Sequence, residues 1–143
     1  MRRAVALAIV GAFAVINNVS ASESVKAIVN SYLEAHAALA SDKLEGVRAP
    51  AAAMAAEAEK MGQGGATIAK QARALEQATD LNAARQAFNP LSESVIAAAK
   101  AANLPDVKVA YCPMAKGSWL QKDSTIKNPY YGSQMLTCGE FKK

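Results

Sequence analysis

The residues best suited to chemistry in this chain are sulfur-containing side chains near the C-terminus. Cys112 and Met114 lie two positions apart, and Met135 and Cys138 lie three positions apart. Soft sulfur ligands favour copper as Cu(I), and by the same reasoning silver as Ag(I), over hard cations. Two or three such ligands are enough for Cu(I), whereas structural zinc usually takes four nitrogen or sulfur ligands. The sequence therefore predicts a soft-metal site made of these four residues.

The single histidine is a fifth candidate ligand. His36 can add an imidazole to the sulfur ligands if the first predicted helix packs beneath the C-terminal segment. A lone histidine on an apolar stripe is more often a hydrogen-bonded core residue than a metal ligand, so a structural role is the alternative. Because the chain has one histidine, any Ser-His-Asp or Cys-His catalytic arrangement has to use it.

Other catalytic and cofactor motifs are missing from the sequence. It has no His-Glu-x-x-His motif, no phosphate-binding glycine loop and no Cys-x-x-Cys-His haem attachment. The carboxylates are scattered over the outer faces of the predicted helices, where they serve solvation. We therefore expect a protein that is not an enzyme and that holds no organic cofactor.

The two cysteines have a second interpretation. In an exported protein, Cys112 and Cys138 can form a structural disulfide. Such a bond closes a loop of about 25 residues and stabilises the fold by about 3 kcal/mol. The two hypotheses exclude each other at any moment, because a disulfide sulfur is not a thiolate ligand. Both hypotheses predict that these cysteines are neighbours, with Cα atoms within about 7 Å.

The N-terminus predicts export. Met1–Arg3 is basic, Ala4–Ile16 is continuously apolar, and Val19–Ala21 has the small residues that signal peptidase requires. The apolar run of about 13 residues is short for a membrane span, which needs roughly 20. We expect a signal peptide over residues 1–21, a periplasmic or secreted product, and no stable membrane insertion after cleavage.

The remaining chain, residues 22–143, is long enough for one domain with one core. Loss of Arg2 and Arg3 with the leader lowers the formal net charge from +4 to +2. This charge is small and evenly spread, so it does not indicate nucleic acid or an anionic membrane as a partner.

Apolar residues recur at helical spacing along most of this domain. The pattern predicts helices over residues 24–40, 42–61, 66–78 and 80–104. Many of the inward positions are alanine, which allows helices to approach closely. We therefore expect an antiparallel bundle of three or four helices.

Local signals suggest how these helices begin and bend. Asp42 and Glu45 have the spacing of a capping box at the start of the second helix, and Asp80 is placed to cap the fourth. Pro50 and Pro90 lie inside apolar patterns that continue in phase on both sides. Proline disrupts a helix interior, so we expect the helices to bend at both positions without ending.

The C-terminal segment, residues 106–141, differs from the helical part. Val107, Val109 and Tyr111 alternate with other residues, which is typical of a short strand. The rest is rich in turn residues, and a long stretch of this kind is usually functional or cross-linked. The predicted fold is therefore mainly α, a helical bundle followed by an irregular, turn-rich segment that carries both cysteines.

The same segment contains a recognisable series of short motifs. They are Tyr111-Cys112-Pro113-Met114-Ala115, Trp119-Leu120, Asn128-Pro129-Tyr130-Tyr131-Gly132 and Met135-Leu136-x-Cys138-Gly139. The series resembles a bacterial exported domain of unknown function, which occurs alone and also fused to periplasmic adaptor subunits of copper/silver efflux systems. The resemblance implies a helical domain in heavy-metal handling, with an efflux adaptor or another metal-handling protein as its partner.

The region around Cys112 is also similar to the Tyr-x-Cys-Pro-Met-His-Pro motif of short heavy-metal-binding domains. Ala115 stands where that motif has histidine, so one potential ligand is missing. Together these features predict an exported accessory protein that binds Cu(I) or Ag(I) through sulfur. The alternative is a disulfide-stabilised helical module that docks on a partner protein without metal.

Overall fold

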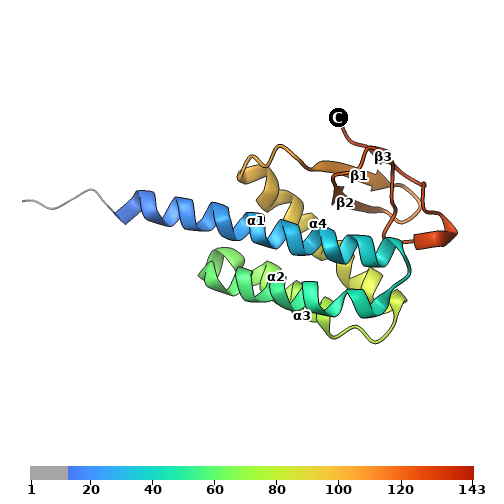
Figure 1. The fold of residues 1–143 in the computed structure, drawn as a ribbon, viewed down its shortest axis with the longest axis horizontal. Helices are drawn as coiled ribbons and strands as arrows, with labels where there is room; N and C mark the ends of the chain where they lie inside the picture. Colours follow the sequence, from blue (N-terminus) through green and yellow to red (C-terminus); the bar gives the residue numbers. More distant parts are fainter. Residues whose placement is uncertain (1–12) are drawn as a thin grey trace, which may run out of the picture.

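The computed structural model describes residues 13–143, with side chains from residue 21 onward. Four helices pack together, namely α1 (Phe13–Ala40), α2 (Arg48–Lys60), α3 (Ala66–Glu76) and α4 (Leu81–Ala101). Successive helices run in alternating directions, and α1 and α4 lie between the α2–α3 pair and a small sheet (Figure 1). The prediction of a mainly helical bundle is confirmed.

The predicted leader lies largely outside the described residues. Where the chain is described, α1 continues without a break through Ala21 and Ser22, the predicted cleavage point. No helix of the described residues is both long enough and apolar enough to cross a bilayer.

The core is formed by side chains from all four helices and from two strands. Alanines at inward positions of α2, including Ala51, Ala55 and Ala58, are fully buried, which is the close approach that the alanine pattern predicts. Larger side chains fill the space between the helices and beneath the sheet. Those that are fully buried include Tyr32, Leu39, Met54, Leu75, Phe88, Leu91 and Trp119.

The two helical prolines have different roles. Pro90 lies inside α4, and the helix continues through it to Ala101, as predicted. Pro50 is the third residue of α2, which begins at Arg48 after the short 3-10 turn η1 (Leu44–Gly46). An N–H in the first turn of a helix has no helical acceptor, so proline is tolerated there. The predicted bend at Pro50 within a continuous helix is therefore wrong.

The two predicted acidic caps also differ. Asp80 caps α4, and its Oδ1 accepts a hydrogen bond from Ala83 N at 2.8 Å. Asp42 does not cap α2, since the residue before that helix is Val47 and no side chain caps it. The Asp42 carboxylate instead accepts from Arg85 Nη2 at 2.6 Å. The predicted capping box is wrong because a partner distant in sequence takes this carboxylate.

The C-terminal segment contains more regular structure than its turn-rich sequence suggests. Strands β1 (Lys108–Cys112), β2 (Gly117–Gln121) and β3 (Glu140–Phe141) form an antiparallel sheet in the order β2-β1-β3. Ala110 in β1 pairs with Trp119 on one side and Phe141 on the other. The predicted short strand is confirmed as β1. The prediction of irregular backbone holds only for the loops and for the turns around the 3-10 helix η3 (Gly132–Gln134).

The sheet is joined to the helices by buried polar groups as well as by packing. Every residue of β2 is buried. The Tyr32 hydroxyl of α1 accepts a hydrogen bond from Leu120 N at 3.3 Å and lies 2.6 Å from Ser92 Oγ of α4. The Tyr32 ring also stacks on Phe88. One tyrosine therefore connects α1, α4 and β2.

Arg85 makes a second connection between the helices and the C-terminal segment. Its Nη2 donates to Leu39 O at the end of α1 at 3.0 Å and to Asp42, and its Nε donates to Pro129 O at 2.9 Å. Hydrogen bonds from Ser133 and from Arg85 lower the pKa of Asp42 to about 2. The guanidinium thus holds the turn after α1 against the segment that leads to Cys138.

Replacing Arg85 with alanine is expected to lower the free energy of unfolding by about 1–3 kcal/mol, because partly buried carbonyls lose a charged donor. Arg73→Ala is the matched control, since Arg73 pairs with Glu59 and Glu76 at the surface. Such exposed ion pairs contribute little, so the control should lose much less stability. Urea unfolding of both variants measures the difference, and equal losses would contradict the connecting role of Arg85.

Candidate functional site

Cys112 lies at the end of β1, where a tight hairpin begins. It pairs with Gly117 across the hairpin, and the loop between them ends with Lys116 at a φ of 50°. The loop turns the backbone over the sulfur, so Ala115 N donates to Cys112 Sγ at 3.4 Å. A Cβ at Gly117 would lie 2.7 Å from the Tyr130 ring, so glycine allows this ring to pack on the hairpin. Cys112 is fully buried.

Cys138 is brought to this hairpin by the fully buried side chain of Asn128. Its Oδ1 accepts from Tyr130 N at 2.8 Å and from Tyr131 N at 3.2 Å. Its Nδ2 donates to Cys138 O at 2.8 Å, and its backbone N donates to Leu136 O at 2.7 Å. These bonds fix the turn after Asn128, and they hold the backbone at Cys138 beside Asn128.

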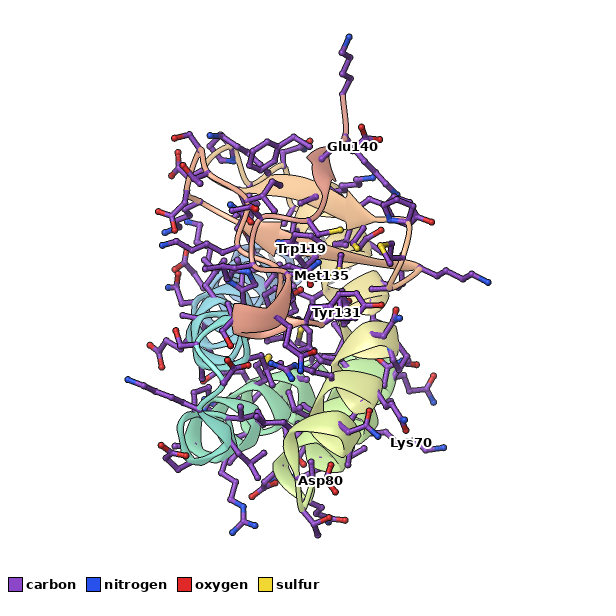
Figure 2. All side chains as sticks on the ribbon, turned by 90° about the vertical axis from the view of Figure 1, so that its right-hand side faces the viewer. Lys70, Asp80, Trp119, Tyr131, Met135 and Glu140 are labelled. Carbon is purple, nitrogen blue, oxygen red and sulfur yellow. The ribbon has the colours of Figure 1, made fainter. Side chains whose placement is uncertain are left out.

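The segment before Cys138 closes one end of the molecule. Cys138 N donates to Met135 O at 3.0 Å, so the two residues share a single turn. In Figure 2, which looks at this end, Met135 and Tyr131 are labelled on the segment between the sheet and the helices. Gly139 follows with a φ of 136°, and a Cβ there would lie 2.8 Å from the Trp119 ring.

The two cysteines are neighbours. Cys112 Sγ and Cys138 Sγ lie 3.3 Å apart, and both cysteines are free. A disulfide bond is about 2.05 Å long, so the sulfurs are in contact without being bonded. Cys112 is buried, whereas Cys138 is partly exposed.

The surroundings of the two cysteines shift their pKa values in opposite directions. Burial alone would raise the pKa of Cys112, but hydrogen bonds from Ala115 N–H, Cys138 and nearby groups outweigh it and lower that pKa. The hydrogen bond to Cys112, followed by burial, raises the pKa of Cys138. The first proton lost by the pair therefore leaves the negative charge on Cys112, with Cys138 as the hydrogen-bond donor.

Each methionine of the predicted site lies close in sequence to one of the cysteines. Met114 is in the hairpin loop and is 62% exposed, which is unusual for a large apolar side chain. Met135 is half-buried in the turn that ends at Cys138. Each thiol therefore has one thioether within three positions of it in the sequence.

The structure places His36 in a different environment. Its buried imidazole donates from Nε2 to Lys127 O at 2.7 Å, since a carbonyl oxygen can only accept. Burial lowers the pKa of His36, and the charge of Lys127 adds to this effect. Among the described side chains, no three His, Cys, Asp or Glu residues gather as a metal-binding group. His36 is therefore not brought together with both cysteines.

The sequence does not indicate that two buried amide side chains position the segment. One is that of Asn128, which the sequence marks only as part of an Asn-Pro turn motif. The other is Gln121, whose Oε1 accepts from Trp119 Nε1 at 2.8 Å and from Lys127 N at 3.1 Å. Gln121 Nε2 donates to Asp123 O and Thr125 O, which holds the loop after β2. A buried glutamine gives no sequence signal of its own.

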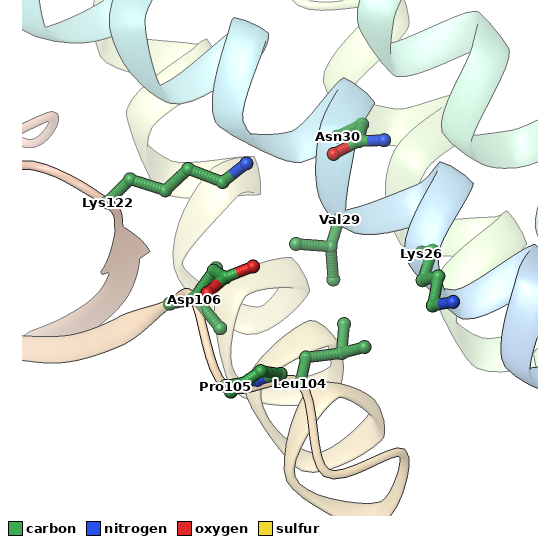
Figure 3. A pocket seen from close by; sticks show the side chains of 8 residues that line it. Lys26, Val29, Asn30, Leu104, Pro105, Asp106 and Lys122 are labelled. Atoms are coloured by element: carbon green, nitrogen blue, oxygen red, sulfur yellow. The ribbon is translucent and has the colours of Figure 1, made fainter.

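An open cavity of about 200 Å³ lies beside α1 and the loop that follows α4. Figure 3 shows Val29 above Leu104, with Lys26 and Lys122 on opposite sides. Lys26 is already paired with Glu23 at 2.9 Å. No candidate ligand of the sequence analysis lines this cavity, so it is separate from the cysteine pair.

Residues 28–106 match the family described as "Protein of unknown function (DUF3347)". The match covers more than half of the chain. The chain belongs to this family. The DUF3347 match begins in α1 and ends before β1, so it includes the helices and excludes both cysteines. No curated protein and no solved structure matches the chain.

Asn128→Asp is expected to lower the free energy of unfolding by about 1–3 kcal/mol, because Cys138 O loses its buried donor. Asn30→Asp is the control, since Asn30 is exposed on α1 and the same change should cost less than about 0.5 kcal/mol. Urea unfolding at pH 7 compares the two. A small effect at Asn128 would show that its amide does not hold the segment.

The lowered pKa of His36 predicts a pH-dependent stability. In the unfolded chain the imidazole binds a proton near pH 6.5, whereas the folded chain resists protonation. The free energy of unfolding should therefore fall as the pH decreases from 7.5 to 5.5. His36→Gln keeps an N–H donor for Lys127 O and should show a weaker dependence. An unchanged slope in this variant would assign the effect to other groups.

Proposed function

We propose that this DUF3347 protein is an exported accessory protein that binds Cu(I) or Ag(I) through Cys112 and Cys138. The observation that carries the proposal is the 3.3 Å separation of the two free thiol sulfurs, which lie 26 positions apart in the chain. Thiolates are the ligands that soft monovalent metals prefer. Among the described residues no carboxylate or imidazole completes a site for a harder cation with this pair.

Metal binding requires a small rearrangement of the pair. At metal–sulfur distances of about 2.3 Å, a linear two-thiolate site needs sulfurs more than about 4 Å apart. Cys138 is the sulfur suited to move, because its side chain is partly exposed, whereas the Cys112 side chain is fully buried at the end of β1. A bent arrangement that keeps the sulfurs closer leaves room for a third ligand.

The methionines are the candidates for that third ligand. Met135 shares a turn with Cys138, and Met114 follows Cys112 by two positions. The high exposure of Met114 leaves its thioether free to turn toward a metal. A thioether is a soft ligand without charge, so it holds the metal less tightly than a third thiolate would. Weaker binding suits a metal ion that is passed on to a partner.

The predicted location and partner are part of the proposal. The N-terminal leader pattern supports a periplasmic or secreted protein. The resemblance of the C-terminal motifs to domains fused to copper/silver efflux adaptors supports such an adaptor, or another metal-handling protein, as the partner.

A second candidate function is a disulfide-stabilised module that docks on a partner without metal. The short distance between the thiols supports it equally, because they need to approach by little more than 1 Å to bond. The exposure of Met114 and of Leu136, at 62% and 37%, also favours it. These large apolar side chains each lie two positions from a cysteine, and exposed apolar groups are typical of contact surfaces.

Titration of the reduced protein with Cu(I) against a competing chelator tests the first function. We expect the wild-type protein to compete and both Cys112→Ser and Cys138→Ser to fail. Met114→Leu and Met135→Leu conserve volume. Each should weaken binding by about tenfold, or about 1.4 kcal/mol, if the thioether is a ligand.

Met61→Leu, at the end of α2, is the matched control and should bind as the wild type does. Unchanged binding in both test methionine variants would remove the thioethers from the site. No binding by the reduced wild-type protein would overturn the metal function and favour the disulfide module.

A further inference from the structure

The two sulfurs of the pair differ in their access to solvent. Cys112 has no exposed surface, and its sulfur is covered by the hairpin loop, where Ala115 N lies 3.4 Å away. Cys138 is partly exposed, in a turn outside the strands. A thiol or disulfide from solution can therefore meet one sulfur of the pair and not the other.

We propose that Cys112 and Cys138 form a thiol–disulfide exchange site in which outside thiols and disulfides react at Cys138, while Cys112 is the internal sulfur. The substrates are small or peptide thiols and disulfides. This activity needs no metal, and it holds whether or not the protein binds copper.

In the oxidising direction, Cys138 passes its proton to the Cys112 thiolate, to which it is hydrogen-bonded, and its own thiolate attacks a substrate disulfide, RS–SR. A bond forms between Cys138 Sγ and one substrate sulfur, and the other substrate sulfur leaves as RS⁻. Cys112, which lies 3.3 Å from Cys138 Sγ and also gives up its proton, then attacks that sulfur and expels the second RS⁻. The pair has lost two electrons as a disulfide forms, and the substrate disulfide has been reduced to two thiols.

In the reducing direction the same bonds change in reverse. A substrate thiolate attacks the exposed Cys138 Sγ, and the electron pair of the disulfide moves to Cys112 Sγ. The N–H of Ala115 points at this sulfur and stabilises it as the leaving group. A second substrate thiolate then attacks the substrate sulfur of this mixed disulfide and displaces Cys138 as a thiolate. The two substrate thiols are thereby oxidised to RS–SR, and the cysteine pair is reduced.

The fold favours this division of roles because only one of the two side chains has open space beside it. The Cys112 side chain is fully buried at the end of a paired strand, whereas the Cys138 side chain is partly exposed on a backbone that Asn128 holds. The approach from 3.3 Å to a bond of about 2.05 Å can come from rotation of the Cys138 side chain.

The test treats the reduced protein with oxidised glutathione in the presence of a metal chelator. Wild-type protein should end with an internal disulfide and no lasting glutathione adduct. Cys112→Ala should accumulate one glutathione on Cys138, because no internal thiol can resolve it. Cys138→Ala should form its adduct at least about tenfold more slowly, because Cys112 is buried. Mass spectrometry of intact protein and of peptides measures all three.

Unfolding in urea tests whether burial causes the difference in rate. Once unfolded, Cys112→Ala and Cys138→Ala should form adducts at similar rates, since the remaining thiol of each is then exposed. If Cys112→Ala does not fold, acid-quenched wild-type protein still reports the order of reaction, with the transient adduct expected on the Cys138 peptide. An adduct that appears first on Cys112, or a wild-type protein that forms no internal disulfide, would overturn the proposal. Neither result bears on the proposed metal function, which the Cu(I) titration of reduced protein tests separately.

Discussion

The cysteine pair depends on the hydrogen bonds of one fully buried amide, that of Asn128. A buried amide must use its oxygen and its N–H groups inside the protein, because water is not there to replace a missing partner. Asn128 does so by accepting from Tyr130 N and Tyr131 N and by donating to Cys138 O. The carbonyl of Cys138 is thereby fixed relative to a turn that Arg85 joins to the helices. The position of the second thiol thus follows from satisfied polar groups, with apolar packing as support.

The helical part was predictable because its signals are local. Apolar spacing marks the four helices, and Asp80 caps the helix that directly follows it. The failure at Asp42 has the opposite cause. Its carboxylate has the sequence spacing of a cap, yet its shortest hydrogen bond is from Arg85, 43 positions away. An ion pair between residues so distant in the chain cannot be predicted from the residues next to Asp42.

The sheet and the full site were only partly predictable. All five residues of β2 are buried, so Trp119 and Leu120 lie in a run without the alternation that marks a half-exposed strand. The short β3 is recognised by its pairing with β1 alone. Both interpretations of the cysteines correctly required the chain to bring Cys138 back to Cys112. The burial of Asn128 could not be inferred from residue types, whereas the apolar stripe around His36 already indicated a place in the core.

The amide of Asn128 also limits how the chain can vary in length. It bonds to a carbonyl ten positions ahead, and Gly132 between them is closed in by Asp42 and Arg85, where a Cβ would collide. An added or deleted residue in this stretch would shift Cys138 away from its thiol neighbour. The turn between α2 and α3 is different, since open space surrounds Gly64. Homologous chains should therefore keep a constant spacing at the sulfur-bearing end and accept insertions at that helical turn.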